Sequence, residues 1–163
     1  VYERGDYVQA MKLFRQLAEK GHQWAQRRVG LMYAEGKGVP QDYQEAVKWY
    51  GLAAAQGNVP AQYSLGLAYE KGQGVPQDYS EAQRLFGAAA EKGNARAQVQ
   101  MGKMYDEGRG VPRDVVQAHK WWNLAGSQGD GEGSALRDFA ATKMTPAQIA
   151  EAQRLASEWT GAR

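Results

Sequence analysis

The amino-acid sequence predicts an all-α protein, a right-handed α/α solenoid in which antiparallel helix pairs stack in chain order. Three observations predict this fold: a motif recurs every 36 residues, each period holds two stretches with helical spacing of apolar residues, and glycines or N-cap residues mark the ends of those stretches. The chain of 163 residues is within the range of a single domain, which we place at residues 1–163.

The repeat is clearest in one motif, which reads GKGVPQDYQEA at 36–46, GQGVPQDYSEA at 72–82 and GRGVPRDVVQA at 108–118. Its glycines and lysine suggest a phosphate-binding loop, but the spacing does not fit. Five residues instead of four separate the glycines of GLMYAEGKG, and Gly38 stands where Ser or Thr should follow the lysine. We therefore predict a structural turn between helices. Its recurring residues are Gly36, Gly38, Asp42, Gly72, Gly74, Asp78, Gly108, Gly110 and Asp114.

One helix of each pair begins at the aspartate of this motif. After Asp42, Tyr43, Ala46, Val47 and Tyr50 follow the i, i+3, i+4, i+7 spacing of a buried helical face. Glu or Gln three residues after the aspartate resembles a capping box. The pairs are Asp6/Gln9, Asp42/Glu45, Asp78/Glu81 and Asp114/Gln117. The same pattern predicts an N-terminal entry helix within residues 1–21.

The other helix begins after a recurring glycine, with Asn58, Asn94 and Asp130 as N-cap residues. Gly30, Gly66 and Gly102 recur in its interior, where glycine is unfavourable, so we expect a neighbouring helix to approach closely there. These signals place the full repeats at 22–57, 58–93 and 94–129.

The pattern weakens at the C-terminus. Residues 130–144 read as a degenerate repeat, and we interpret SQGDGEGS (127–134) as a worn repeat boundary rather than a mobile binding loop. Thr145, Pro146 and Gln148 then predict a helix start, so residues 145–159 are expected to cap the solenoid.

The sequence offers no catalytic, metal or cofactor site. It has no cysteine and only two histidines, of which we predict His119 to be packed and His22 to lie in a cap or turn. A net charge of +2 does not favour nucleic acid, and no apolar run reaches the ~18 residues of a membrane helix. The expected partner is therefore another protein or a peptide.

A strip that varies between repeats lies on the face of the first helices opposite their core residues, and we expect this face to line the concave surface of the solenoid. It is rich in the aromatic and arginine side chains that are common at interfaces. The predicted partner-binding residues are Trp24, Arg27, Arg28, Leu31, Tyr63, Leu67, Glu70, Arg96, Val99, Lys103 and Asp106. We expect Trp24 and Tyr63 to contribute most, and Arg137 to flank the strip. Trp122 belongs to a core aromatic column, and Trp49 and Trp121 are expected to pack between repeats.

The segment AQYSLGLAYEKGQGVPQDYSEAQRLFGAAAEKGN (61–94) and its neighbours resemble Sel-one-like repeats (SLR), which are relatives of tetratricopeptide arrays. The resemblance implies that the Ala/Gly/Tyr helix is the first of each pair and the Asp-capped helix the second. Residues 2–21 are then a second helix whose partner lies upstream or was trimmed away. Val1 in place of Met fits either a cleaved signal peptide or a trimmed chain.

The resemblance also implies a function. It predicts a non-enzymatic scaffold that binds a protein or peptide on its concave groove, in the periplasm or cell envelope, with the cytoplasm as the alternative. A second possibility is an immunity protein that neutralises a secreted bacterial toxin or lipase effector. A third is a cell-wall-active hydrolase, which the absence of clustered histidines and of an activated serine disfavours.

Overall fold

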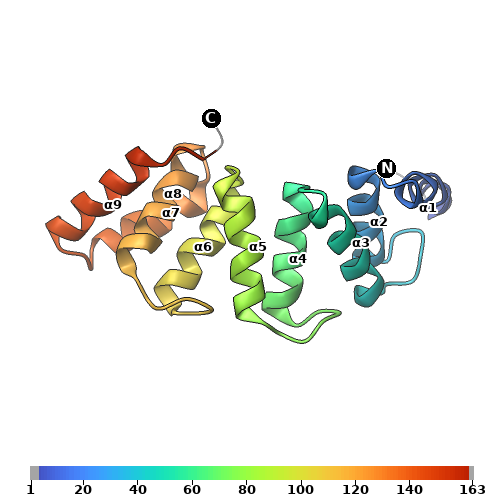
Figure 1. The fold of residues 1–163 in the computed structure, drawn as a ribbon, viewed down its shortest axis with the longest axis horizontal. Coiled ribbons are helices and arrows are strands. Elements are labelled where there is room, and N and C mark those ends of the chain that lie inside the picture. The colour runs from blue at the N-terminus through green and yellow to red at the C-terminus, as the bar shows by residue number, and fades with distance from the viewer. Residues whose placement is uncertain (1–3, 162–163) are drawn as a thin grey trace. The chain divides into compact units, whose positions relative to one another are not determined.

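The structure, a computed structural model, describes residues 4–161, and this part of the chain is all-helical as predicted (Figure 1). Two helices of nearly equal length occupy each full repeat. The helices are α1 (Arg4–Glu19), α2 (Gln23–Glu35), α3 (Tyr43–Ala55), α4 (Val59–Lys71), α5 (Tyr79–Glu91), α6 (Ala95–Glu107), α7 (Val115–Ser127), α8 (Gly131–Ala141) and α9 (Pro146–Glu158).

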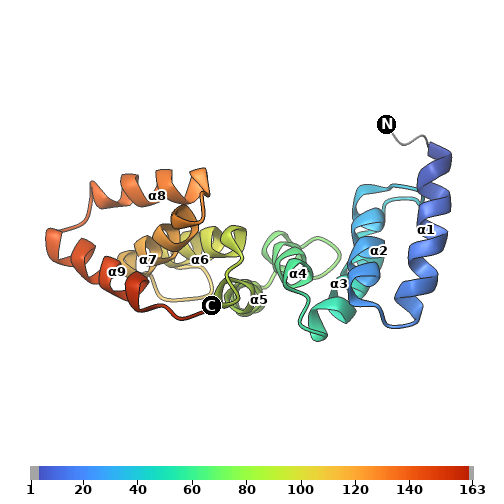
Figure 2. The same cartoon turned by 90° about the horizontal axis from the view of Figure 1, so that it is seen from above.

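The chain divides into two compact units, residues 1–78 with α1 to α4 and residues 79–163 with α5 to α9. In the first unit each helix packs on the next, α1 on α2, α2 on α3 and α3 on α4. In the second unit α5 to α8 do the same, and α9 returns to pack on α7 (Figure 2). The predicted packing of helices in sequential pairs is confirmed inside each unit. The single domain predicted over residues 1–163 stays a prediction beside this division.

The helix caps form largely as predicted. The Asp42 carboxylate accepts hydrogen bonds from the amides of Gln44 and Glu45, and Asp114 caps α7 in the same way. The reciprocal capping box forms at Thr145 and Gln148. At Asp42 the backbone amide already donates to the Tyr33 carbonyl, so the Glu45 side chain is free to pair with a lysine instead. One expectation was wrong: Asp6 lies inside α1, which begins at Arg4, and is not its N-cap.

The second glycine of each loop motif does more than permit a turn. Gly38, Gly74 and Gly110 have φ between 71° and 77°, a backbone conformation that side chains disfavour. A Cβ at Gly38 or Gly74 would also overlap the carbonyl oxygen of Tyr7 or Tyr43. The loop therefore lies directly on the backbone at the start of the preceding second helix, and only glycine leaves room for it.

Gly30 and Gly102, inside first helices, lie where the following helix approaches closely, as their recurrence predicted, and they make room for aromatic rings. A Cβ at Gly30 would lie 2.7 Å from Cδ1 of Tyr50, and one at Gly102 would overlap the indole of Trp122. Trp122 is 3% exposed and its Nε1 donates to the Val99 carbonyl oxygen at 3.2 Å. Paired glycines and aromatic rings therefore fix the approach of α2 to α3 and of α6 to α7.

Buried glutamines join α2 to α1 and α6 to α5. The side-chain amides of Gln26 and Gln98 donate to the carbonyl oxygens of Ala18 and Ala90 at 3.2 Å, which satisfies acceptors in the last turn of the preceding helix. An exposed glutamine then donates to each of these side chains, and for Gln98 it is Gln128, at 2.8 Å. The sequence prediction does not include this network, although its buried position is glutamine in all three repeats, at Gln26, Gln62 and Gln98.

Gln128→Ala is expected to lower the free energy of unfolding by about 1–2 kcal/mol, although Gln128 is exposed. The substitution leaves the side-chain oxygen of Gln98, a residue with 0% exposure, without its donor. Urea unfolding followed by circular dichroism measures the loss. Gln153→Ala, at an exposed position of α9, is the control and should change the midpoint little. Equal midpoints for the two variants would contradict the role given to the network.

Candidate functional site

In the first unit, two residues of the predicted strip line a groove. Leu31 on α2 and Leu67 on α4 line a cavity of about 180 Å³ together with Tyr43, Val47 and Tyr50 of α3. Two first helices and the second helix between them in the chain therefore form this groove. Leu31 and Leu67 are both half-buried, which leaves part of each side chain accessible from the groove.

The second unit repeats this arrangement. Lys103 and Asp106 of α6 line a groove of about 320 Å³, and Val115 and Trp122 of α7 lie in its lining. The opposite wall carries Phe139, which is 61% exposed and lies on α8. Phe139 is not among the predicted site residues because it falls in the degenerate repeat. Its position is nevertheless 36 residues after Lys103, and the same column contains Leu31 and Leu67.

A third groove, of about 430 Å³, lies between α1 and α2. Trp24, 49% exposed, meets the ring of Phe14 edge-on, with centroids 5.7 Å apart. The Arg28 guanidinium lies 5.5 Å from the centroid of the same ring. Phe14 thus contacts two predicted site residues that are exposed, Trp24 and Arg28. The sequence prediction assigned Phe14 to the core column and so left it out of the site.

Two predicted strip residues are placed differently. Val99 is 3% exposed and belongs to the core, since α8 packs on α6 as well as on α7. Its side chain is therefore not available to a partner, contrary to expectation. Arg27 is half-buried, and its Nε is enclosed without a hydrogen-bond partner among the described residues. Burial raises the pKa of Tyr50 to about 12, and the positive charge of Arg27 opposes that rise.

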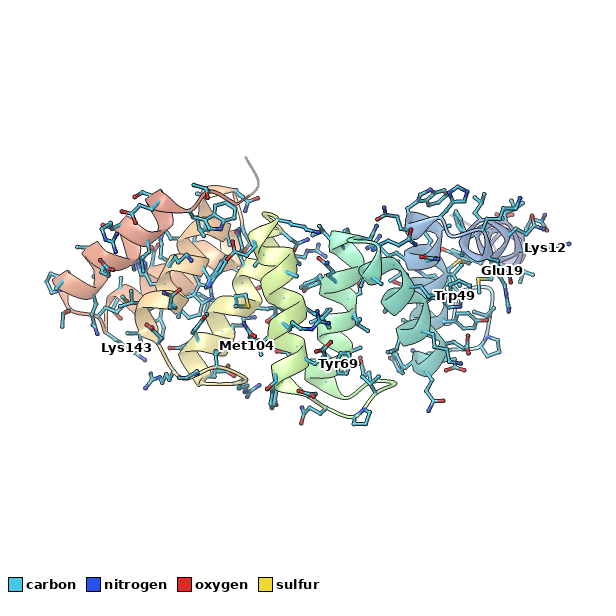
Figure 3. The ribbon with its side chains drawn as sticks, in the orientation of Figure 1. Lys12, Glu19, Trp49, Tyr69, Met104 and Lys143 are labelled. Atoms are coloured by element: carbon cyan, nitrogen blue, oxygen red, sulfur yellow. The ribbon has the colours of Figure 1, made fainter. Side chains whose placement is uncertain are left out.

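The other predicted strip residues keep some exposure. Arg96 is exposed, whereas Tyr63 and Glu70 are half-buried. Lys103 is half-buried and its Nζ forms an ion pair with Glu132 at 2.6 Å. Asp106 lies 3.9 Å from a guanidinium nitrogen of Arg113. Lys143, just beyond α8 (Figure 3), stands over the Phe139 ring at 4.3 Å and adds a cation to this end of the groove.

The other three tryptophans considered in the sequence analysis have structural positions. Trp121 and Trp122 are 4% and 3% exposed, which agrees with the core role predicted for Trp122. Trp49 packs against the buried cluster that α1 and α2 form around Val29. Arg137, predicted to flank the strip, donates to Asn123 and pairs with Asp138.

His119 is the more deeply buried of the two histidines. It is 2% exposed, and its Nδ1 has no hydrogen-bond partner among the described residues. Burial lowers the pKa of His119, the nearby charge of Arg137 lowers it further, and Asp138 acts in the opposite direction. His22, in contrast, is exposed at the start of α2 and makes no side-chain cap bond. The prediction of a packed His119 is confirmed.

Acid is expected to destabilise the protein through His119. Since its pKa is lower in the folded state, the unfolded state binds more protons, so stability is complete above the ordinary histidine pKa of about 6.5 and falls as the pH drops below it. Urea midpoints of the wild type and His119→Gln, measured between pH 7.5 and 5, check this. The variant should lose less stability over that range than the wild type. Because His22 is exposed, His22→Gln is the control and should keep the wild-type profile.

The segment 127–134 is a repeat boundary, as the sequence indicates. Asp130 accepts a hydrogen bond from the Gly133 amide, and α8 begins at Gly131. Within residues 4–161, no group of three or more His, Asp or Glu side chains is placed to hold a metal ion. In the same range, every helix is too short or too polar to span a bilayer.

Comparisons with known proteins agree with this geometry. The family model for the Sel1 repeat matches residues 2–22, 25–58, 59–94 and 95–130. These boundaries lie close to those predicted for the entry helix and the three full repeats, and the matches cover most of the chain. Among curated proteins, none matches the chain at a significant level.

Two solved structures share the fold over nearly the whole chain. A protective antigen present in uropathogenic Escherichia coli strains, which displays an SLR fold, is 34% identical with a TM-score of 0.87, over 93% of this chain and 32% of its own. A Sel1 repeat protein from Oxalobacter formigenes is 29% identical with a TM-score of 0.79, over 94% of this chain and 65% of its own. The chain thus spans about a third of the first protein and just under two thirds of the second.

An immunity protein from Pseudomonas aeruginosa aligns more weakly, with 18% identity and a TM-score of 0.45 over 93% of this chain and 74% of its own. That similarity is too low to bear on function. The repeat matches, the paired helices and the two SLR structures lead to one conclusion, that this chain belongs to the Sel1 repeat family.

Proposed function

We propose that this chain is a non-enzymatic module that binds a protein or peptide in the grooves beside its first helices. The observation that carries this proposal is a single position that recurs every 36 residues and lines the grooves in both units. Leu31 and Leu67 occupy it in the first unit, and Lys103 and Phe139 in the second. Grooves that share an arrangement of helices but differ in their lining side chains are suited to recognising different parts of an extended partner.

Exposure of large side chains supports the same proposal. Trp24 presents about half of its surface to solvent while its ring rests on Phe14. A fixed, accessible tryptophan beside an arginine has the composition of the residues that contribute most to protein interfaces. Tyr63 lies on α4 of the same unit and is half-buried. Together they offer anchors on both first helices of this unit.

Capture from the native host tests the proposal. A partner recovered by the wild-type chain and identified by mass spectrometry is purified, and its affinity for Trp24→Ala/Tyr63→Ala is measured. We expect affinity to fall by tenfold or more, as for truncation of interface anchors. Leu52→Ala removes an equally exposed apolar side chain from α3, outside the grooves, and should bind like the wild type. Unchanged affinity of this double variant, and of Leu31→Ala/Leu67→Ala in the groove lining, would overturn the groove assignment.

A location in the periplasm or cell envelope belongs to the same proposal and rests on membership of the Sel1 repeat family. Release of the chain with the periplasmic fraction of the native host checks it. Neutralisation of a secreted toxin would be one form of such binding, although no separate feature of the described residues favours it.

A further inference from the structure

The groove between α1 and α2 has a positive mouth and an apolar floor. Arg28 and Lys37 are exposed at its rim, and Ala10, Leu31 and Met32 line its interior. Lys37 is neutralised by Glu35, with Nζ and Oε2 at 2.7 Å. Arg28 has no such partner, because no carboxylate among the described residues lies within ion-pair distance of it.

Arg28 is held in place without being neutralised. Its guanidinium carbon lies 5.5 Å from the centroid of the Phe14 ring, and this cation–π contact favours one conformation of a long, exposed side chain. A guanidinium fixed in this way loses less conformational entropy when it binds a carboxylate through two parallel hydrogen bonds. The site is therefore prepared for an anion and repels a cation.

An arginine at this position occurs in the α1–α2 groove but not in the α2–α4 groove. In the groove between α2 and α4, the position of Arg28 is taken by Ser64 and the position of Lys37 by Gln73. That groove has a cation of its own in its lining, Lys71, which is the last residue of α4. The two grooves therefore differ in the position and type of the cation, and in the α1–α2 groove it is an arginine that lies over the Phe14 ring.

We propose that the α1–α2 groove binds a peptide segment in which an acidic residue adjoins a bulky apolar one, with the carboxylate on Arg28 and the apolar side chain over Leu31 and Met32. This inference rests on the proposed function, since it names the chemistry of the segment that one groove receives.

The test uses the whole chain and three terminally blocked octapeptides, GSLDFDSG and the two probes in which Asn or Lys replaces both Asp residues. Binding is followed in ¹⁵N-correlated NMR spectra through the Trp24 indole and the Leu31 amide. We expect the Asp probe to shift these signals and to bind about tenfold more tightly than the Asn probe, with the Lys probe weakest. The preference should decrease as salt is raised, since the rim is exposed.

Arg28→Gln should reduce the affinity for the Asp probe to that for the Asn probe and leave the latter unchanged. Lys12→Gln makes the same change of charge on α1, where Lys12 is exposed and points away from α2 (Figure 3), and should leave the preference intact. A thermal unfolding midpoint for each variant establishes that it is folded.

Equal affinities for the Asp and Asn probes, an unaffected preference in Arg28→Gln, shifts confined to other helices, or no binding of the Asp probe would each overturn the inference. The proposed function is judged separately. If the native partner still requires Trp24 and Tyr63 while the probes fail, the groove binds protein and only the acidic segment is wrong.

Discussion

Gly74→Ala is expected to lower the free energy of unfolding by about 2–5 kcal/mol, one of the largest effects of a single methyl group in this chain. Two penalties combine. Gly74 has a φ of 77°, where an L side chain costs roughly 1–2 kcal/mol. The added Cβ also overlaps the carbonyl oxygen of Tyr43 in the first turn of α3, and neither backbone segment can move without disturbing a helix start. Urea unfolding of the whole chain measures the loss.

Gly21→Ala separates the two penalties. Gly21 has a φ of 90°, but a Cβ there would meet nothing within 4 Å. This variant should lose only the stability that an L side chain costs at positive φ, about 1–2 kcal/mol. The difference between Gly74→Ala and Gly21→Ala then measures the close approach of the loop to the helix. If the two variants lose equal stability, the overlap at Tyr43 is relieved at no cost and the second penalty is wrong.

These paired positions show how far the sequence predicts the fold. Period and capping signals are local, so Asp42, Asn58, Gly36 and Thr145 could be assigned to helix ends before the structure was known. The contact between Gly74 and Tyr43 could not be assigned, because it depends on how a loop lies against a helix one repeat earlier. The same limit applies to the buried glutamines Gln26 and Gln98, because their acceptors lie on the preceding helix.

The candidate site was predicted less completely, for a related reason. Helical periodicity gives the face on which a residue lies, but not which element covers that face. Val99 lies on the predicted strip and yet is buried, because α8 packs on α6. Phe14 lies on a core column and yet supports exposed Trp24 and Arg28 at the side of α1. Phe139 is missing from the predicted site because it lies in a degenerate repeat, although it is 36 residues after Lys103 and so belongs to the same column.

Trp122→Ala should destabilise the protein by about 3–5 kcal/mol, because it empties a site that is 3% exposed and removes the hydrogen bond to the Val99 carbonyl. Urea unfolding measures the loss. Trp24→Ala, at a half-exposed tryptophan, is the control and should cost much less. Similar losses at the two positions would mean that the ring of Trp122 contributes little to the core.

The glycine opposite this ring allows a sharper test, since its role is to make room for Trp122. Gly102→Ala alone should destabilise by roughly 1–3 kcal/mol, because its methyl group overlaps the indole. In the Trp122→Ala background the same methyl enters vacated space, and the higher helix propensity of alanine should make it neutral or stabilising by up to about 1 kcal/mol. Gly87→Ala, where a Cβ meets Gln83 and Met101 at an ordinary 3.7–3.9 Å, should be stabilising in both backgrounds. A Gly102→Ala effect of the same size and sign with and without the ring would show that the two positions are independent, and the ring would then not be what requires glycine in this helix.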